Sequence, residues 1–395
     1  MNTPKIRFKG FKDDWEQRKL GEIVLRESLA RESTIDLPYV EYEDVIAEEG
    51  RINKDIRKKE GIKKGIFFDG SQVLYGKLRP YLHNWLNPDF SGVAVGDWWV
   101  LKPNNVDKNF IYRLIQTQQF DDIANQSTGS KMPRADWNLV SNTEFAIPTS
   151  QVEQTKIGGY FSTLDNLITL HQRKCDETKQ LKKFMLQKMF PENGEKNPEI
   201  RFEGFTDDWE QRKLGDVCSR VQGNDGRMEL PTLTISAGNG WMRQEDRFSG
   251  NIAGKEQKNY TLLRKGELSY NHGNSKLAKY GTVFSLQTYE EALVPRVYHS
   301  FKVKEGNCDF VEYYFATKLP DRELSKLISS GARMDGLLNI GYDEFMGIQM
   351  IFPSTLEQRK ISLYFRKLDH LITLHQRKCE KLKELKKFML QNMFV

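Results

Sequence analysis

The chain has 395 residues, of which 38% are hydrophobic and 29% charged, with a mean hydropathy of -0.64. These values are typical of a globular protein of two to three domains and exclude an intrinsically disordered chain. No apolar run approaches the roughly 18 residues of a transmembrane helix, and the first residues lack the apolar core of a signal peptide. The four cysteines have neither CxxC spacing nor the density of a disulfide scaffold. We therefore expect a cytoplasmic protein with reduced thiols.

The net charge of +6 does not come from the parts of the chain that look globular. Residues 1–150 carry 22 Lys and Arg against 22 Asp and Glu, and residues 198–353 carry 20 against 22. The surplus lies in residues 151–197, with 8 against 6, and in residues 354–395, with 10 against 4. If this protein binds DNA, local cationic patches must supply the attraction, because the large domains are not basic as a whole.

The chain opens with a segment that recurs in its second half. KIRFKGFKDDWEQRKLGEI at 5–23 returns as EIRFEGFTDDWEQRKLGDV at 199–217, with 14 of 19 positions identical. Each copy contains a tryptophan, Trp15 or Trp209, which we interpret as an anchor for domain packing rather than as a ligand platform. Because a missed repeat misassigns a whole architecture, this duplication organises the predictions that follow.

Residues 24–150 and their counterpart, residues 218–353, share little sequence. Both contain short β-rich runs, such as SQVLYGKL and RVYHSFKV, and helical patterns, such as KNFIYRLIQTQQFDDIAN. Strict alternation of strand and helix is missing. We therefore predict two mixed α+β globules with irregular twisted sheets rather than doubly wound domains.

A long helical pattern follows each globule. Residues 157–190 return at 361–394 with 24 of 34 positions identical, including the block LITLHQRKC. A helix over 154–190 would be about 55 Å long, and its apolar stripe needs a partner. Each helix could pack on its own globule, or the two copies could pack on each other about a pseudo-two-fold axis. The near-identical faces favour the second arrangement, an antiparallel coiled coil that acts as a ruler.

The heptad pattern defines a predicted seam between the two helices. Its residues are Ile157, Leu164, Leu167, His171 and Leu181 in the first helix, and Ile361, Leu368, Leu371, His375 and Leu385 in the second. The predicted organisation is then a globule at 1–150, a helix at 151–191, a globule at 192–353 and a helix at 354–395.

Several stretches of the globules suit a polyanion. YGKLRPYLHNW at 75–85 interleaves cations with aromatic residues, and SYNHGNSKLAKY at 269–280 places amides and lysines around a glycine. A glycine-containing loop near the end of each globule could present backbone amides and a cation to a phosphate. For each stretch, a solvated strand face or a tight turn is the alternative. The candidate DNA-binding residues are Tyr75, Lys77, Arg79, Tyr81, His83, Asn84, Ser130, Lys131, Arg134, Asn271, His272, Asn274, Ser275, Lys276, Lys279 and Arg333.

Motifs of known enzyme classes are missing from the sequence. It contains no GxxxxGK[ST], HExxH, GxSxG or GxGxxG motif and no Cys/His cluster at zinc spacing. His171 and His375 occupy matching positions on the helical stripe, where we interpret them as a polar layer that fixes register rather than as catalytic groups. We predict a chain without catalytic activity, metal site or cofactor of its own.

The order of variable globule, repeated helix, variable globule and repeated helix resembles the specificity subunit of type I restriction-modification systems. The WEQRKLG openings, the YGKLRPYL stretch and the LITLHQRK helices carry the resemblance, which covers the whole chain. The resemblance implies a non-catalytic subunit whose globules are target recognition domains, each reading one half of a bipartite, asymmetric site in double-stranded DNA. Two such readers would address half-sites about one duplex turn, roughly 34–36 Å, apart.

The resemblance also implies partners. The helix pair would dock two methyltransferase subunits, which recruit restriction subunits, and S-adenosylmethionine, ATP and Mg would belong to those partners. A two-headed coiled-coil scaffold that binds proteins without DNA sequence preference is the alternative function. An enzyme that acts on nucleic acid is the third, and metal-dependent nicking by the purified chain would support it.

Overall fold

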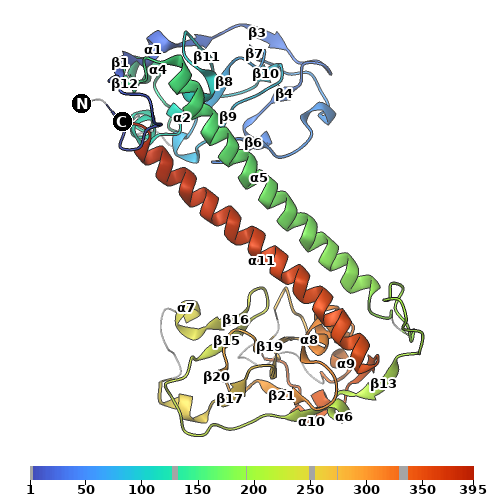
Figure 1. The fold of residues 1–395 in the computed structure, drawn as a ribbon. Coiled ribbons are helices and arrows are strands. Elements are labelled where there is room, and N and C mark those ends of the chain that lie inside the picture. The colour runs from blue at the N-terminus through green and yellow to red at the C-terminus, as the bar shows by residue number, and fades with distance from the viewer. Residues whose placement is uncertain (1–2, 127–131, 193, 249–253, 274, 329–336) are drawn as a thin grey trace. The chain divides into compact units, whose positions relative to one another are not determined.

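The computed structural model of the chain describes residues 3–126, 132–192, 194–248, 254–273, 275–328 and 337–395. It consists of two compact units. Unit 1 contains Met1–Arg173 and His375–Val395, and unit 2 contains Lys174–Leu374. Each unit therefore holds one globule and part of each long helix, α5 (Gln151–Lys188) and α11 (Thr355–Asn392) (Figure 1).

The globule of unit 1 is built from short strands around two four-stranded sheets, ordered β2-β11-β8-β9 and β3-β7-β10-β4. Only the β4–β10 pair among its described strands is parallel. The strands are β1 (Glu16–Lys19), β2 (Val24–Glu27), β3 (Ala30–Glu32), β4 (Tyr39–Val40), β5 (Val45–Ile46), β6 (Arg51–Ile52), β7 (Lys64–Phe68), β8 (Val73–Gly76), β9 (Trp85–Leu86), β10 (Gly92–Ala94), β11 (Trp98–Pro103) and β12 (Glu144–Ile147). The helices are α1 (Leu20–Ile23), η1 (Tyr42–Asp44), η2 (Ile56–Lys58), η3 (Pro80–Leu82), α2 (Lys108–Leu114), α3 (Gln118–Ala124) and α4 (Trp137–Asn142).

The globule of unit 2 has one four-stranded sheet, ordered β14-β21-β18-β19, and three two-stranded pairs. Its strands are β13 (Glu210–Lys213), β14 (Cys218–Arg220), β15 (Leu233–Ser236), β16 (Gly240–Arg243), β17 (Thr261–Arg264), β18 (Leu268–Asn271), β19 (Thr282–Ser285), β20 (Glu291–Val294), β21 (His299–Val303) and β22 (Gln349–Phe352). Its helices are α6 (Leu214–Val217), α7 (Gln244–Phe248), η4 (Gly254–Asn259), α8 (Cys308–Ala316), α9 (Asp321–Lys326) and α10 (Tyr342–Met346).

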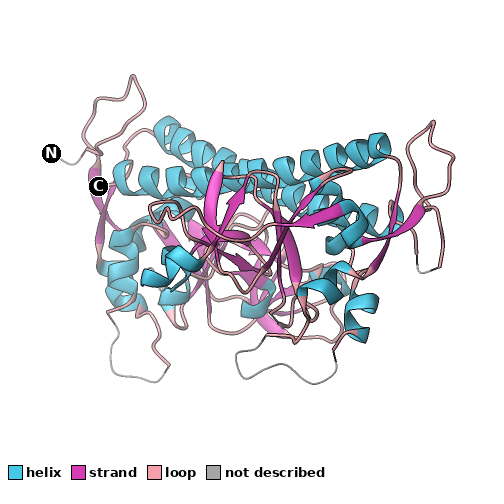
Figure 2. Ribbon diagram, turned by 90° about the horizontal axis from the view of Figure 1, so that it is seen from below, coloured by secondary structure: helices cyan, strands magenta, loops and turns pink. Residues whose placement is uncertain are grey.

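The two globules share a topology although their sequences diverge. In both, a strand that follows the opening helix pairs with the strand that precedes the first longer helix: β2 with β11, and β14 with β21. Helices and short strands mix throughout both globules (Figure 2). The predicted α+β class with two β-rich domains and two long packed helices is confirmed.

The repeated opening segment makes the same contacts in both units. Arg7 pairs with the buried carboxylate of Glu153 at 2.6 Å, and Arg201 pairs with that of Glu357 at 2.8 Å. Trp15 and Trp209 are each 2% exposed, so both pack inside a core as predicted. Both segments therefore fix the start of a long helix to its globule, which explains why their sequences are so similar.

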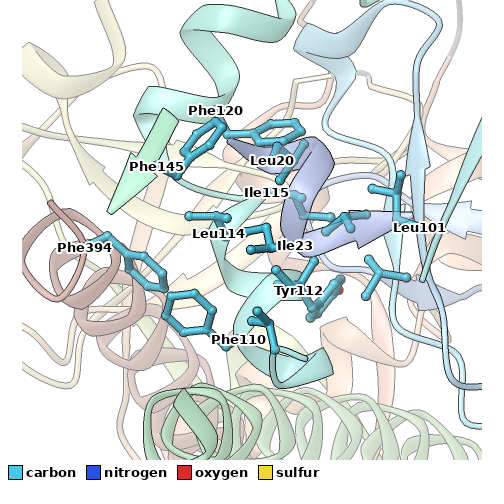
Figure 3. Close-up of a cluster of buried hydrophobic side chains, with 14 of the residues drawn as sticks. Leu20, Ile23, Leu101, Phe110, Tyr112, Leu114, Ile115, Phe120, Phe145 and Phe394 are labelled. Carbon is cyan, nitrogen blue, oxygen red and sulfur yellow. The ribbon is translucent and has the colours of Figure 1, made fainter. Parts of the chain in front are cut away.

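The core of unit 1 joins the globule to both helices. Phe110 of α2 stacks against Phe394, which follows α11, at 5.4 Å between ring centroids (Figure 3). Ile157 and Leu164 of α5 belong to the same buried cluster. The helices therefore pack on each other and also on the globule. These two arrangements were alternatives when judged from the sequence, but both occur.

Within unit 1 the helix pairing is antiparallel. In unit 1 Phe161 lies beside Phe394, and the Nδ1 atoms of His171 and His375 are 3.0 Å apart. Ile157, Leu164 and their copies Ile361 and Leu368 are buried, and their place on the seam stays a prediction. Leu167, Leu181, Leu371 and Leu385 do not lie on the seam, because they are 38%, 44%, 41% and 39% exposed.

The four misplaced leucines are each one residue away from the seam. The less exposed neighbours in α5 are Ile168 and Lys182, where the prediction had residues 167 and 181. Leu167 and Ile168 are both apolar, so periodicity could not separate them, and a lysine at 182 looks like a solvated position. The predicted d positions at 167 and 181 are therefore exposed, whereas the a positions at 157 and 164 are buried.

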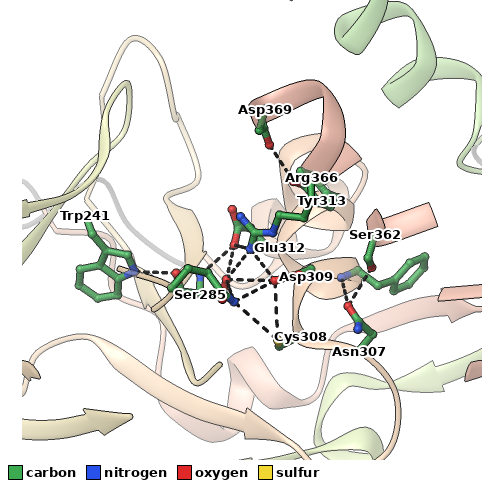
Figure 4. A network of polar contacts seen from close by, with 12 residues as sticks. Trp241, Ser285, Asn307, Cys308, Asp309, Glu312, Tyr313, Ser362, Arg366 and Asp369 are labelled. Atoms are coloured by element: carbon green, nitrogen blue, oxygen red, sulfur yellow. Dashed lines mark hydrogen bonds and ion pairs between the residues drawn. The ribbon is translucent and has the colours of Figure 1, made fainter. Parts of the chain in front are cut away.

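Charged side chains fasten each globule to the helices. In unit 2, Arg366 of α11 pairs with Asp309 and, at 3.2 Å, with Glu312, both on α8 (Figure 4). Tyr313 donates a hydrogen bond to Asp369 at 2.7 Å. In unit 1, Arg113 of α2 pairs with Asp165 of α5 at 2.6 Å. These contacts fix the orientation of each globule on its own stretch of helix.

Among the described residues, no helix combines the length and apolar character that crossing a bilayer requires.

Candidate nucleic-acid interface

The structure brings together two stretches of unit 1 that the sequence singled out separately. Residues 77–84 connect β8 to β9, and they meet residues 132–135 through an antiparallel bridge between Leu78 and Arg134. The Arg79 N–H donates to the Pro133 carbonyl at 2.7 Å, and the Ala135 N–H donates to the Lys77 carbonyl at 2.8 Å. We call residues 77–84 and 132–135 the first loop pair.

The first loop pair holds strained backbone. Arg79 and His83 flank η3 with φ of 49° and 53°, in the left-handed region that side chains other than glycine rarely adopt. Such conformations persist only where surrounding contacts impose them, and they cluster at functional sites. The bond from the Arg79 N–H to Pro133 is one such contact.

Asp97 organises the cations of the first loop pair. Its carboxylate accepts two hydrogen bonds from Arg134, at 3.1 and 3.0 Å, and lies 3.6 Å from the Lys77 ammonium. The Arg134 guanidinium holds the pKa of Asp97 below its ordinary value, against the effect of burial. Because Asp97 offsets part of both positive charges, Lys77 and Arg134 are weaker candidates for phosphate contact than an unpaired cation.

The tip of the first loop pair is exposed. Tyr81 is 52% and Leu82 41% exposed. Arg79 is exposed too, and within the described part of the chain its side chain makes no hydrogen bond or ion pair. A free guanidinium beside an exposed aromatic ring has the chemistry needed for a phosphate or a base edge.

Unit 2 contains an equivalent arrangement with different side chains. Gly273, just after β18, forms an antiparallel bridge with Leu337, and the Leu338 N–H donates to the His272 carbonyl at 2.9 Å. We call residues 271–280 and 337–338 the second loop pair, with the exception of residue 274, which lies outside the described residues. Gly273 and Leu337 are thus joined just as Leu78 and Arg134 are in unit 1.

A tight turn presents the cations of the second loop pair. The Ala278 N–H donates to the Ser275 carbonyl and hydroxyl, each at 3.1 Å. Lys276 and Lys279 are exposed at this turn, and Leu277 between them is 71% exposed. Lys279 lies 5.2 Å from the centre of the Tyr280 ring. Two cations and an apolar side chain therefore project from the turn.

Three predicted contact residues are buried, and their assignment is wrong. Tyr75 is 2% exposed and stacks on Trp99 in the core, and Asn84 is 8% exposed on the strand side of its loop. His272 is 7% exposed, with its ring 4.9 Å from that of His299. A side chain enclosed by core residues cannot meet DNA. Four further candidates lie outside the described residues: Ser130, Lys131, Asn274 and Arg333.

Two other candidates already have protein partners. The His83 ring is 3.0 Å from Asp121 and 3.4 Å from Glu48, and it stacks on Trp85. Asn271 donates to the Ile235 carbonyl at 3.3 Å and accepts from the Gly273 N–H at 3.1 Å. Their side chains hold the loops in place, so contact between either and DNA stays a prediction.

Sequence reasoning missed the residues that position the loops. Asp97 was not among the candidates, since one acid in a strand-like run carries no pattern. Asp165 and Lys386 were also missed, although a signal existed: both recur in the repeat, as Asp369 and Lys182. A shared ion pair explains that recurrence, because Lys386 lies 2.8 Å from Asp165 and Lys182 lies 2.5 Å from Asp369.

No group of three or more His, Cys, Asp or Glu side chains in the described ranges is arranged to hold a metal ion.

Comparison with known proteins connects these features to a family. A family model described as the type I restriction modification DNA specificity domain matches residues 12–180. That range covers most of the first globule and most of α5. The second half of the chain repeats the opening segment of this globule and the sequence of this helix. Residues 12–180 are therefore similar to this family's DNA specificity domain.

The chain is similar in fold to a solved structure. A type I restriction-modification S subunit from M. genitalium aligns with a TM-score of 0.62 at 13% identity, over 100% of this chain and 99% of that one. The HsdS subunit from Thermoanaerobacter tengcongensis aligns at 18% identity over 96% of each chain, with a TM-score of 0.44. A chain from a structure of complex assembly and conformational transition of the type I R-M system aligns at 17% identity and a TM-score of 0.48, over 95% of this chain and 96% of that one. We take the likeness of fold from the first alone. No curated protein sequence matches.

Proposed function

We propose that this chain is a specificity subunit that reads a bipartite, asymmetric DNA site, with the first loop pair reading one half and the second loop pair the other. The observation that carries the proposal is the equivalent bridge in the two units, Leu78 to Arg134 and Gly273 to Leu337. The same backbone frame presents Arg79 and Tyr81 in one unit and Lys276 and Lys279 in the other. Different side chains on a common frame support different half-sites.

The near-neutral charge of the globules fits a subunit that does not bind DNA alone. Asp and Glu balance the Lys and Arg of each globule, so non-specific attraction to the duplex must come largely from elsewhere. We propose that methyltransferase and restriction subunits supply it, together with the S-adenosylmethionine, ATP and Mg that their reactions use. The complex would work on DNA inside the cell.

The helix pair offers a docking face for a partner that binds twice. Three exposed apolar side chains of α5 recur at matching exposed positions of α11: Leu167 with Leu371, Leu181 with Leu385, and Phe184 with Phe388. Contact with solvent alone gives no reason for the same apolar side chain at each pair of matching exposed positions. Two copies of one partner protein that bind equivalent surfaces would give such a reason. We assign this face to two methyltransferase subunits.

Exchange of one globule tests the proposal. Residues 24–150 are replaced by the corresponding segment of a relative, the chimaera is expressed with the methyltransferase, and methylated motifs are mapped across a host genome. We expect one half of the motif to change and the other half to stay. A change in both halves, or in neither, would show that the globules are not independent readers. Methylation without sequence preference would favour a protein-binding scaffold.

A further inference from the structure

A cavity of 740 Å³ lies in unit 1 between the globule and both long helices. Residues 47–51, the β9 region, the end of α2 and the start of α3 line one side, and residues 162–169 and 383–391 line the other. Its volume lies within the range of about 300–1,000 Å³ typical of small-molecule sites. Because its walls come from the globule and both helices, a ligand here would tie those three parts together.

Cations outnumber carboxylates on the helical side of the cavity. Asp165 lies between two of them, 2.6 Å from Arg113 and 2.8 Å from Lys386. Glu49 likewise accepts from Arg51 and lies 3.4 Å from Lys383. Each carboxylate therefore faces two positive charges, which leaves room for an additional anion.

Lys387 adds a further positive charge to this wall. Its side chain is exposed and forms no ion pair within the described ranges. Glu48 and Asp121 flank His83 on the opposite wall. The cavity thus has a cationic side on α11, whereas its globule side carries both signs, because Arg51 and Arg113 line it together with Glu48, Glu49 and Asp121.

Buried polar atoms in the wall lack partners. Arg113 is 2% exposed and Trp85 8% exposed, and neither the Nε of Arg113 nor the Nε1 of Trp85 donates a hydrogen bond to any described residue. The Oδ1 of Asn87 also accepts none from them. A buried donor without an acceptor is costly, so two of them beside one cavity indicate that a ligand with acceptor oxygens completes the site.

We propose that this cavity binds a phosphate-bearing small molecule of nucleotide size. The phosphate would lie beside Lys386 and Lys387, and an amino-bearing ring would lie toward Asp121 and Glu48. The volume exceeds that of a phosphate ion alone, and those two carboxylates accept from the exocyclic amine of a base. The site adjoins the first loop pair through His83, whereas Arg79, Tyr81 and Leu82, the exposed residues of that loop pair, do not line it.

The repeat supplies a matched control for a binding experiment. Lys183 of α5 occupies the position of Lys387 in an LKKF sequence that both helices share, and it does not line this cavity. The full-length chain, Lys387→Met, Lys183→Met and Trp85→Phe are titrated with deoxyadenosine 5′-monophosphate, with inorganic phosphate and with a short duplex DNA by isothermal calorimetry. Circular dichroism confirms that each variant is folded.

We expect the mononucleotide to bind with a dissociation constant below about 1 mM and more tightly than phosphate. Lys387→Met should weaken it about five- to tenfold, and Lys183→Met should leave it unchanged. Trp85→Phe should weaken binding, because it removes the buried indole donor, and it should also lower the melting temperature, because Trp85 belongs to the core. A purely structural tryptophan would lower the melting temperature and leave the affinity of the folded variant unchanged.

Four results would overturn the proposal. They are an absence of mononucleotide binding by the folded chain, equal affinity for phosphate and mononucleotide, equal loss in the two lysine variants, and displacement of the mononucleotide by duplex DNA of arbitrary sequence. The last would mean that these cations serve the DNA backbone instead of a small molecule.

Discussion

The Lys386 ammonium lies 2.8 Å from the Asp165 carboxylate, and this contact joins α11 to α5 within unit 1. The repeat of this pair, Lys182 with Asp369 at 2.5 Å, joins the same two helices within unit 2. Each aspartate has a second partner from its own globule, Arg113 or Tyr313. Helix register and globule orientation are therefore fixed at one residue in each unit.

Removal of Asp165 should destabilise unit 1. Asp165→Ala leaves Arg113 and Lys386 without their carboxylate, and both cations are largely buried. We expect a loss of about 3 kcal/mol in the free energy of unfolding. This value is at the low end of the range for a broken buried ion pair, because Asp165 is 26% exposed. Urea unfolding measures the loss, with the exposed Glu177→Ala on the same helix as control. A variant as stable as the control would show that this ion pair does not hold the helices.

The sequence predicted the helices well because duplication made their pattern visible. The length and pairing of α5 and α11, and the buried positions Ile157 and Leu164, follow from heptads that occur twice. Leu181 was misplaced because the adjacent position on the seam is Lys182, whose burial depends on Asp369 in the other helix. A pattern of apolar residues cannot reveal a charged residue that is buried by its partner.

The candidate interface was harder to predict than the fold. Arg79 and Lys276 are exposed as expected, whereas Tyr75 and His272, close by in the sequence, point into cores. Alternation along a strand gives opposite faces, but it does not say which face is buried in an irregular sheet. The bridge from Leu78 to Arg134 could not be predicted from the sequence either, because residues that pair across a long stretch of chain show no pattern in the residues next to them.

Arg79 should contribute more to DNA binding than Lys77. Arg79→Ala removes a cation without a protein partner, and we expect a loss of about 1–3 kcal/mol if it contacts a base. Lys77→Ala should cost less, because Asp97 already offsets its charge. Fluorescence anisotropy with the methyltransferase-bound chain and its mapped target, at one fixed salt concentration, measures both. A larger loss for Lys77→Ala would contradict the assignment of Arg79, and equal loss on every sequence would make Arg79 a phosphate contact.

Gly50 lies in the cavity wall at a position that rejects a side chain. Its φ is +62°, and a Cβ there would overlap the Tyr112 hydroxyl oxygen. Gly50→Ala should therefore cost about 1–2 kcal/mol for the backbone alone and more for the clash. Tyr112→Phe removes that oxygen and should rescue part of the loss. Thermal unfolding of the two single variants and the double variant measures the coupling. Simple additivity, within about 0.5 kcal/mol, would mean that the two residues do not meet.

Glu312 should make the stability of unit 2 depend on pH. Burial raises the pKa of this carboxyl, and nearby Arg366 only partly opposes the rise. The folded state therefore holds a proton more tightly than the unfolded state, and this contribution to stability is lost as the pH rises through the folded pKa. The advantage of the wild-type chain over Glu312→Gln in urea unfolding should be larger at pH 5 than at pH 8. Glu177→Gln controls for the loss of an exposed carboxylate. The reverse trend would show that the ion pair with Arg366 dominates.

The repeated exposed face of the helices should bind two methyltransferase subunits independently. Phe184 and Phe388 are 48% and 52% exposed at matching positions, so each is the centre of one equivalent site. Phe184→Glu or Phe388→Glu places a charge in one apolar contact and should cost that site about 2 kcal/mol or more. Native mass spectrometry should then find one bound subunit for each single variant and none for the double variant. Phe248→Glu, which alters a phenylalanine exposed in α7 outside the repeat, should retain two. If either single variant lost both subunits, the two sites would be coupled, and if the double variant kept both, this face would not be the docking site.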